Sequence, residues 1–152
     1  MYRSSAQYKD ASDVGKVEYG ASYRTLINWI RIKQKKINVA HFLKRAGWNK
    51  VILVGAGDLC ELLIEELADS DIKVECVLED NLKKYGEKYK KWGIKSFSEV
   101  ENSFVKGTKV IVTYVDRYNS YINVLLNKNV SVDDVVSIEE MIAYILLDAR
   151  EQ

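Results

Sequence analysis

The chain has 152 residues, a formal net charge of +1 and 47% hydrophobic residues, which is enough for one domain with a core of its own. A net charge near zero gives no electrostatic argument for binding nucleic acid or a membrane surface. No apolar run approaches the ~20 residues that span a bilayer, and the first ten residues contain no apolar signal core. We therefore expect a cytoplasmic protein. With His41, Cys60 and Cys76 as its only histidine and cysteines, we expect no metal site of the His/Cys type.

The first third of the chain predicts an arm followed by a helical extension. Residues 1–18 are polar and show no sustained period, so we expect them to form an arm. Residues 19–36 predict an amphipathic helix, and Asn38 can cap a second short helix that Gly47 ends. The extension, residues 19–47, must bury an apolar face on the sheet edge or on the same helices of a second copy, which predicts a homo-oligomer. The expected apolar stripe of the first helix is Tyr23, Leu26, Ile27 and Ile30.

The stretch from residue 50 to residue 67 predicts a buried strand, a glycine turn and a helix. Residues 51–54 form the apolar run expected of a central parallel strand. Gly55-Ala56-Gly57 then turns the chain, and leucines recur at helical spacing after it. Glycines permit a tight turn and close approach of the backbone, and the N–H groups of the following helix attract phosphate. This is the opening of a nucleotide-binding α/β unit.

The glycine turn departs from the G-x-G-x-x-G fingerprint at the third glycine, and it also carries an unfavourable charge. Cys60 stands at the third glycine, where a small residue can still let the helix pack on the sheet. Asp58 puts a negative charge where a pyrophosphate would pass. Glu79 or Asp80, at the end of the predicted second strand, could hold ribose hydroxyls. The alternative is that the glycines only make a tight turn in a protein that has lost its ligand.

The rest of the chain alternates strands and helices. Strands are predicted at residues 94–97, 109–115 and 134–137, with Ser98 and Ser137 each starting a capping-box sequence. Residues 81–93 predict a basic, aromatic surface loop. Residues 48–152 therefore predict an α/β, Rossmann-like, doubly wound five-stranded parallel sheet of order 3-2-1-4-5. The predicted ligand crevice consists of Gly55, Ala56, Gly57, Asp58, Glu79, Asp80, Thr113, Tyr114 and Val115.

Five segments, in this order, resemble one particular Rossmann-like module: residues 51–63, 73–80, 92–94, 110–113 and 136–141. They are similar to the nucleotide-sugar or CoA-binding-like domains associated with bacterial surface-polysaccharide synthesis. Such domains occur in sugar acetyltransferases and in nucleotide-sugar epimerase/dehydratase proteins. The resemblance implies NAD(P) or a nucleotide-sugar as ligand, with Asp80 as the aspartate that ends the second strand. Cys60 stands where the family has glycine.

Three functions follow as hypotheses. The first is a binding module that holds NAD(P) or a nucleotide-sugar without a complete catalytic set, since no base or nucleophile is evident. The second is a scaffold or oligomerisation protein that works through the N-terminal helices. The third is an NAD(P)-dependent enzyme that modifies sugar nucleotides, with Tyr114, Asp116 and Tyr118 as acid/base candidates. No Tyr-x-x-x-Lys pair follows the predicted fourth strand.

Overall fold

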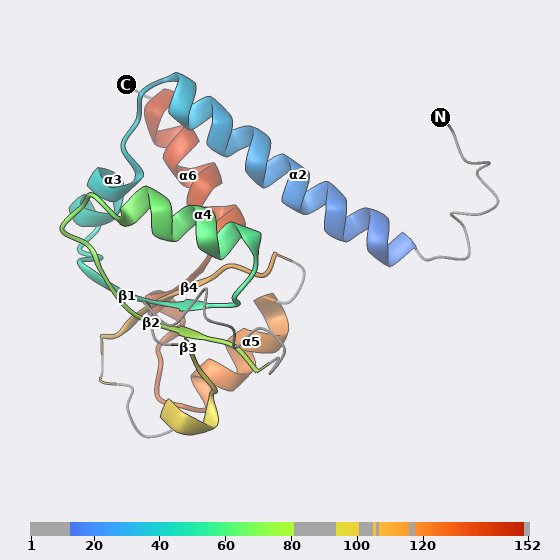
Figure 1. The fold of residues 1–152 in the computed structure, drawn as a ribbon, viewed down its shortest axis with the longest axis vertical. Helices are drawn as coiled ribbons and strands as arrows, with labels where there is room; N and C mark the ends of the chain where they lie inside the picture. Colours follow the sequence, from blue (N-terminus) through green and yellow to red (C-terminus); the bar gives the residue numbers. More distant parts are fainter. Residues whose placement is uncertain (1–12, 81–93, 101–104, 106, 116–117, 151–152) are drawn as a thin grey trace.

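The protein folds around one parallel sheet of order β3-β2-β1-β4-β5 (Figure 1). This computed structural model describes residues 13–80, 94–100, 105, 107–115 and 118–150. The strands are β1 Lys50–Val54, β2 Lys73–Leu78, β3 Ile94–Lys95, β4 Lys109–Val112 and β5 Val135–Ser137. Every neighbouring pair is parallel. The predicted α/β doubly wound fold and its strand order are confirmed.

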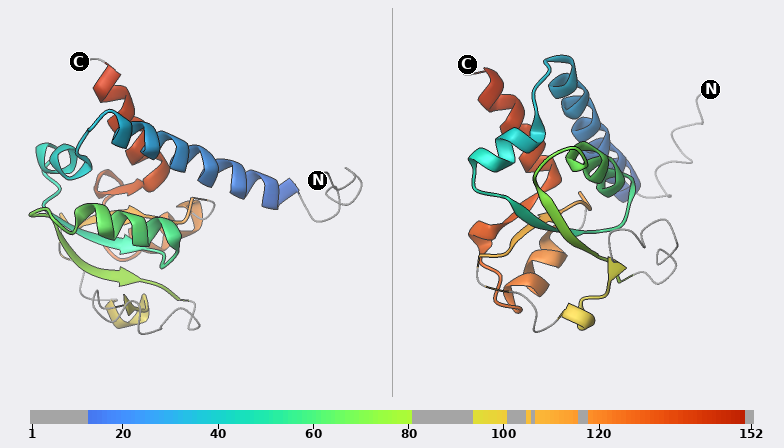
Figure 2. Two further views of the ribbon diagram at one scale, coloured as in Figure 1. Left: turned by 45° about the horizontal axis from the view of Figure 1, so that its top comes forward. Right: turned by 60° about the vertical axis from the view of Figure 1, so that its left-hand side comes forward.

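The helices form two unequal layers (Figures 1 and 2). One face of the sheet carries α2 Asp13–Gln34, α3 Val39–Arg45, α4 Asp58–Leu67 and α6 Ile138–Arg150. The other face carries α5 Tyr118–Leu126, with the short 3₁₀ helix η3 Ser98–Val100 beside it; a second 3₁₀ turn, η4 Val132–Asp134, leads into β5. Two separate apolar clusters fill the two interfaces. In the part of the chain that the structure describes, no helix is long and apolar enough to cross a membrane.

The helix α2 differs from the prediction in its start and in its buried face. It begins at Asp13, six residues before the predicted position, so the last third of the predicted arm is helical. The side buried against the rest of the protein is Ala21, Thr25, Trp29 and Ile32. The predicted stripe was wrong, because Tyr23, Leu26 and Ile30 remain 66%, 37% and 52% exposed.

The physical reason is that α2 carries more apolar surface than one interface can cover. The helix α2 packs against α6, and Trp29 and Ile32 of its buried row belong to the apolar cluster on this face of the sheet. Thr25 can join this row because its hydroxyl donates to the carbonyl of Ala21 at 2.9 Å. The second apolar row is left on the surface.

The pairing of β1 with β2 contains a bulge. Val51 pairs with Val74, but the next residue of β1, Ile52, pairs with Cys76. Glu75 is therefore an extra residue in β2, and its carboxylate pairs with Lys50 at 2.8 Å. The bulge reverses the alternation of β2 between the two faces of the sheet.

Candidate functional site

The glycine turn lies at the carboxyl end of β1, where the winding of the sheet reverses between β1 and β4. Gly55 has a φ of +101°, a conformation that favours glycine. Gly57 is the N-cap of α4 in extended conformation and makes no side-chain cap. The N-terminus of α4 therefore opens at this edge with the positive end of its dipole. Sheets of this kind bind ligands at such a switch point.

The carboxyl group of Glu79 is turned into the protein. It is only 2% exposed, and its Oε2 accepts a hydrogen bond from the backbone N–H of Ala56 at 2.9 Å. The phenol of Tyr114 donates to the same oxygen at 2.5 Å. Glu79 therefore holds the backbone of the glycine turn through the N–H of Ala56. This contact differs from the predicted one with a ribose hydroxyl.

Tyr114 covers the glycine turn from the β4 side. A Cβ built on Gly55 would lie 2.7 Å from Cδ2 of Tyr114, so the ring sits directly against the glycine backbone. Thr113 lies beneath it, with Oγ1 at 2.9 Å from the carbonyl oxygen of Val54 and 2.7 Å from that of Gly55. Val115 is half-buried and packs against the apolar cluster on the face of the sheet covered by α4 and α6. The predicted residues from β1, β2 and β4 thus meet, but they bind one another.

An aromatic row continues from this point. The rings of Tyr114 and Tyr121 stack with centroids 6.0 Å apart, and Tyr121 stacks on Phe97 at 5.7 Å. Tyr121 comes from α5 and Phe97 from the connection between β3 and η3. Tyr114 and Tyr121 are only half-buried, so part of each side chain is exposed to solvent.

Two carboxylates of the predicted crevice remain exposed. Asp58 is the first residue of α4, where a negative charge is stabilised by the helix dipole and competes with any anionic ligand. Asp80 accepts a long hydrogen bond, 3.3 Å, from the backbone N–H of Phe97 through one oxygen. Asp80 is therefore the better placed of the two acids at the end of β2 to reach a ligand hydroxyl.

Cys60 occupies the position of the third fingerprint glycine without opening the helix–sheet interface. It is 0% exposed and lies in the cluster between α4 and the sheet. A thiol is small enough to fill this contact, so the helix still starts beside the turn.

The acid/base candidates for an enzyme are not supported by their surroundings. Burial, followed by the negative charge of Glu140, raises the pKa of Tyr118, which disfavours the phenolate that a base would need. The phenol of Tyr114 is bound to Glu79. Asp116 and the loop at residues 81–93 lie outside the described residues. Among those that the structure describes, no group of three or more His, Cys, Asp and Glu side chains could hold a metal ion.

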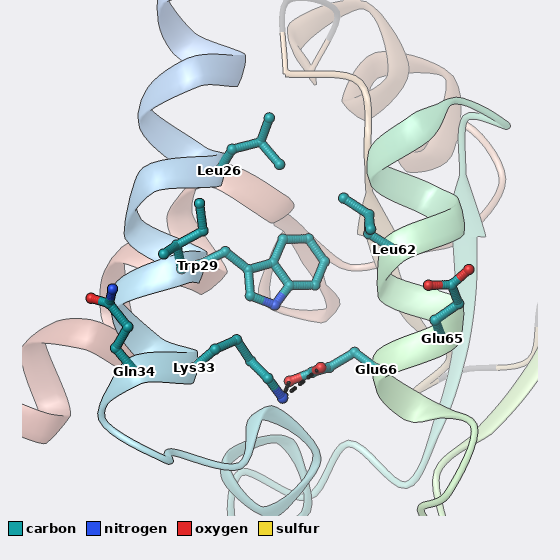
Figure 3. A pocket seen from close by; sticks show the side chains of 8 residues that line it. Leu26, Trp29, Lys33, Gln34, Leu62, Glu65 and Glu66 are labelled. Atoms are coloured by element: carbon teal, nitrogen blue, oxygen red, sulfur yellow. Dashed lines mark hydrogen bonds and ion pairs between the residues drawn. The ribbon is translucent and has the colours of Figure 1, made fainter.

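A second site was not predicted. A groove of about 570 Å³ runs between α2 and α4, with Leu26, Trp29 and Ile30 on one wall and Leu62 on the other (Figure 3). Lys33 and Glu66 close one end through an ion pair of 2.9 Å. The available signal was the surplus of apolar residues on α2, together with Leu62 of α4, which is 40% exposed.

Comparison of the chain with protein-family models, with curated proteins and with solved structures gives no match.

Proposed function

We propose that this protein binds a nucleotide-type ligand, NAD(P) or a nucleotide-sugar, at the glycine turn, and that it does so without a complete catalytic set of its own. The observation that carries the proposal is the meeting of two features at one point: the N-terminus of α4, which lacks a side-chain cap, and the switch between β1 and β4. Backbone N–H groups in this position bind phosphate in sheets of this order. A link to polysaccharide synthesis rests on the sequence resemblance alone.

The local contacts define how such a ligand would bind. Tyr114 lies over Gly55, so a ligand that approaches the turn closely must displace the ring and break its hydrogen bond to Glu79. Asp80 supplies an exposed carboxylate for ribose hydroxyls, and the Tyr114 ring, once displaced from Gly55, is an aromatic group beside which a base can pack.

The test is thermal unfolding with NAD⁺, NADH, NADP⁺, UDP-sugars, CoA and S-adenosylmethionine. A ligand at about a hundred times its Kd stabilises the folded state by ~2.7 kcal/mol, which raises the Tm of a domain of this size by several degrees. Gly57→Asp places a carboxylate on the first N–H groups of α4 and should abolish the shift. Gly57→Asn, which caps the helix equally well without the charge, is the matched control. Equal shifts in the two variants would contradict binding of a phosphate at α4.

A second candidate function is a scaffold that acts through self-association of the N-terminal helices. The observation that favours it is the apolar groove between α2 and α4, together with the exposed row on α2. Exposed apolar patches of this kind often mark protein contacts. Sedimentation of the full chain tests this candidate, since a species of 17.5 kDa at every concentration would contradict it.

A further inference from the structure

The glycine turn is closed by two side chains of the protein itself. Oε2 of Glu79 accepts the hydrogen bond of the Ala56 N–H at 2.9 Å, although backbone N–H groups of such a turn are the groups that bind phosphate. The ring of Tyr114 covers Gly55 so closely that a Cβ on Gly55 would lie 2.7 Å from Cδ2 of the ring. The phenol donates to the same Oε2 at 2.5 Å. One carboxyl oxygen therefore makes both contacts that keep the turn covered.

The backbone around these side chains is fixed by hydrogen bonds to neighbouring strands. The N–H of Gly55 donates to the carbonyl oxygen of Leu78 at 2.8 Å, and the N–H of Thr113 donates to that of Val54 at 2.8 Å. The hydroxyl of Thr113 also donates to the carbonyl oxygen of Gly55 at 2.7 Å. Because these bonds tie the turn to the ends of β2 and β4, access to the turn requires rotation of the Tyr114 side chain rather than movement of a strand.

The surroundings of Tyr114 allow such a rotation. Tyr114 is only half-buried, whereas Val54 and Val112 at the ends of the neighbouring strands are 0% exposed. The ring can therefore turn toward solvent while the core beneath it stays packed. The rotation breaks the hydrogen bond to Glu79 and the stacking on Tyr121, whose ring centroid lies 6.0 Å away. These contacts favour the arrangement in which the turn is covered.

We propose that Tyr114 is a gate on the glycine turn. In the free protein the hydrogen bond to Glu79 holds the ring over Gly55, and a nucleotide binds only to molecules in which the ring has rotated away. The measured affinity is then the affinity of the open form multiplied by the fraction of molecules that are open. The inference rests on the nucleotide binding proposed above and describes how that binding is controlled.

Tyr114→Phe is the variant that tests the gate, because it keeps the ring and removes only the hydroxyl that bonds to Glu79. Isothermal titration calorimetry with NAD⁺ and with UDP-glucose measures Kd for the full chain. The loss of one hydrogen bond to a buried acceptor should increase the open fraction and lower Kd by about fivefold or more. Tyr144→Phe is the matched control, since Tyr144 is 57% exposed on α6, and its Kd should equal that of the wild type.

The direction of the change separates a gate from a structural role. A tyrosine that only stabilises the fold would, when replaced, leave binding unchanged or weaken it. A gate predicts tighter binding by a variant that is itself less stable. Circular dichroism verifies that each variant is folded, and Gly57→Asp in the Tyr114→Phe background should abolish the gain, because the gain arises at the turn.

The possible results distinguish the gate from the binding function. Binding by Tyr114→Phe that is tighter than that of the wild type, or that only the variant shows, supports the gate. Equal or weaker binding by Tyr114→Phe, or a gain that survives Gly57→Asp, overturns the gate while ligand binding stands. If neither the wild type nor Tyr114→Phe binds NAD⁺ or UDP-glucose, the binding function falls and the gate falls with it.

Discussion

Replacing Gly55 by alanine tests how the glycine turn and Tyr114 depend on each other. The substitution places a Cβ on a residue with φ of +101°, and that Cβ lies 2.7 Å from Cδ2 of the Tyr114 ring. A distance below 3.0 Å is not seen for real Cβ contacts, so the ring must move. Since the phenol donates to Glu79, moving the ring also removes a donor from a buried carboxyl group.

The expected decrease in the free energy of unfolding has two parts. A positive φ costs a residue with a Cβ roughly 1–2 kcal/mol, and leaving a buried acceptor without its donor costs about 1–3 kcal/mol. The sum of about 2–5 kcal/mol is a large share of the roughly 5–15 kcal/mol that stabilises a domain. At roughly 2–4 °C per kcal/mol for this chain length, the Tm should fall by about 4–20 °C.

Urea unfolding followed by tryptophan fluorescence measures the loss. Gly47→Ala is the matched control, because Gly47 has φ of +82° but nothing within 4 Å of the added Cβ, so it should show the backbone cost alone. In a Tyr114→Ala background, Gly55→Ala should likewise cost only the backbone term. Equal losses for Gly55→Ala and Gly47→Ala would refute the claimed contact between turn and ring.

Three further predictions concern individual side chains. Tyr114→Phe should lower the free energy of unfolding by about 1–3 kcal/mol, because Glu79 loses a hydrogen bond; an unchanged urea midpoint would contradict the bond. Cys60 and Cys76 are buried, and burial raises the pKa of the Cys76 thiol, so both should react with a thiol reagent about 1000-fold more slowly in the native than in the unfolded chain. The raised pKa of Tyr118 favours its neutral form in the folded state. Its stabilisation is therefore complete below about pH 10, the unfolded value, and is lost as pH rises through the folded value; Tyr118→Phe should flatten this alkaline decline in urea titrations.

The fold was predictable because local patterns and connectivity agree. Four-residue apolar runs, glycine at the turn and helical spacing after it leave one common way to wind a parallel sheet, and the structure has that order. Two predicted helix caps are also confirmed. The side chain of Asn38 accepts a hydrogen bond from the N–H of His41 at 3.1 Å, and that of Ser137 accepts one from the N–H of Glu140 at 3.1 Å. The other capping box was misplaced by two residues, since Ser96 and Glu99 make its reciprocal bonds.

The meeting of the predicted crevice residues was predictable, but their contacts were not. Topology alone brings the ends of β1, β2 and β4 together, so residues predicted at these three ends do lie beside one another. Whether an acidic side chain at the end of β2 points outward or inward depends on strand alternation and on a phenol 35 residues away, Tyr114. The buried face of α2 was missed because two apolar rows on one helix do not reveal which of them packs against the rest of the protein.

The extra residue in β2 decides which acid lies beneath the glycine turn. Val74 and Val77 contact the same apolar cluster although three positions separate them, which a regular strand would forbid. Because Glu75 is an extra residue, Val77 points to the same face of the sheet as Val74, the face covered by α4. Glu79, two residues after Val77, then points to the turn from this side. If Glu75 were paired as a regular strand residue, Val74, Cys76, Leu78 and Asp80 would share one face of the sheet, and Asp80 instead of Glu79 would point to the turn. The identity of the acidic side chain that binds the glycine turn thus depends on a bulge about 13 Å earlier in the strand.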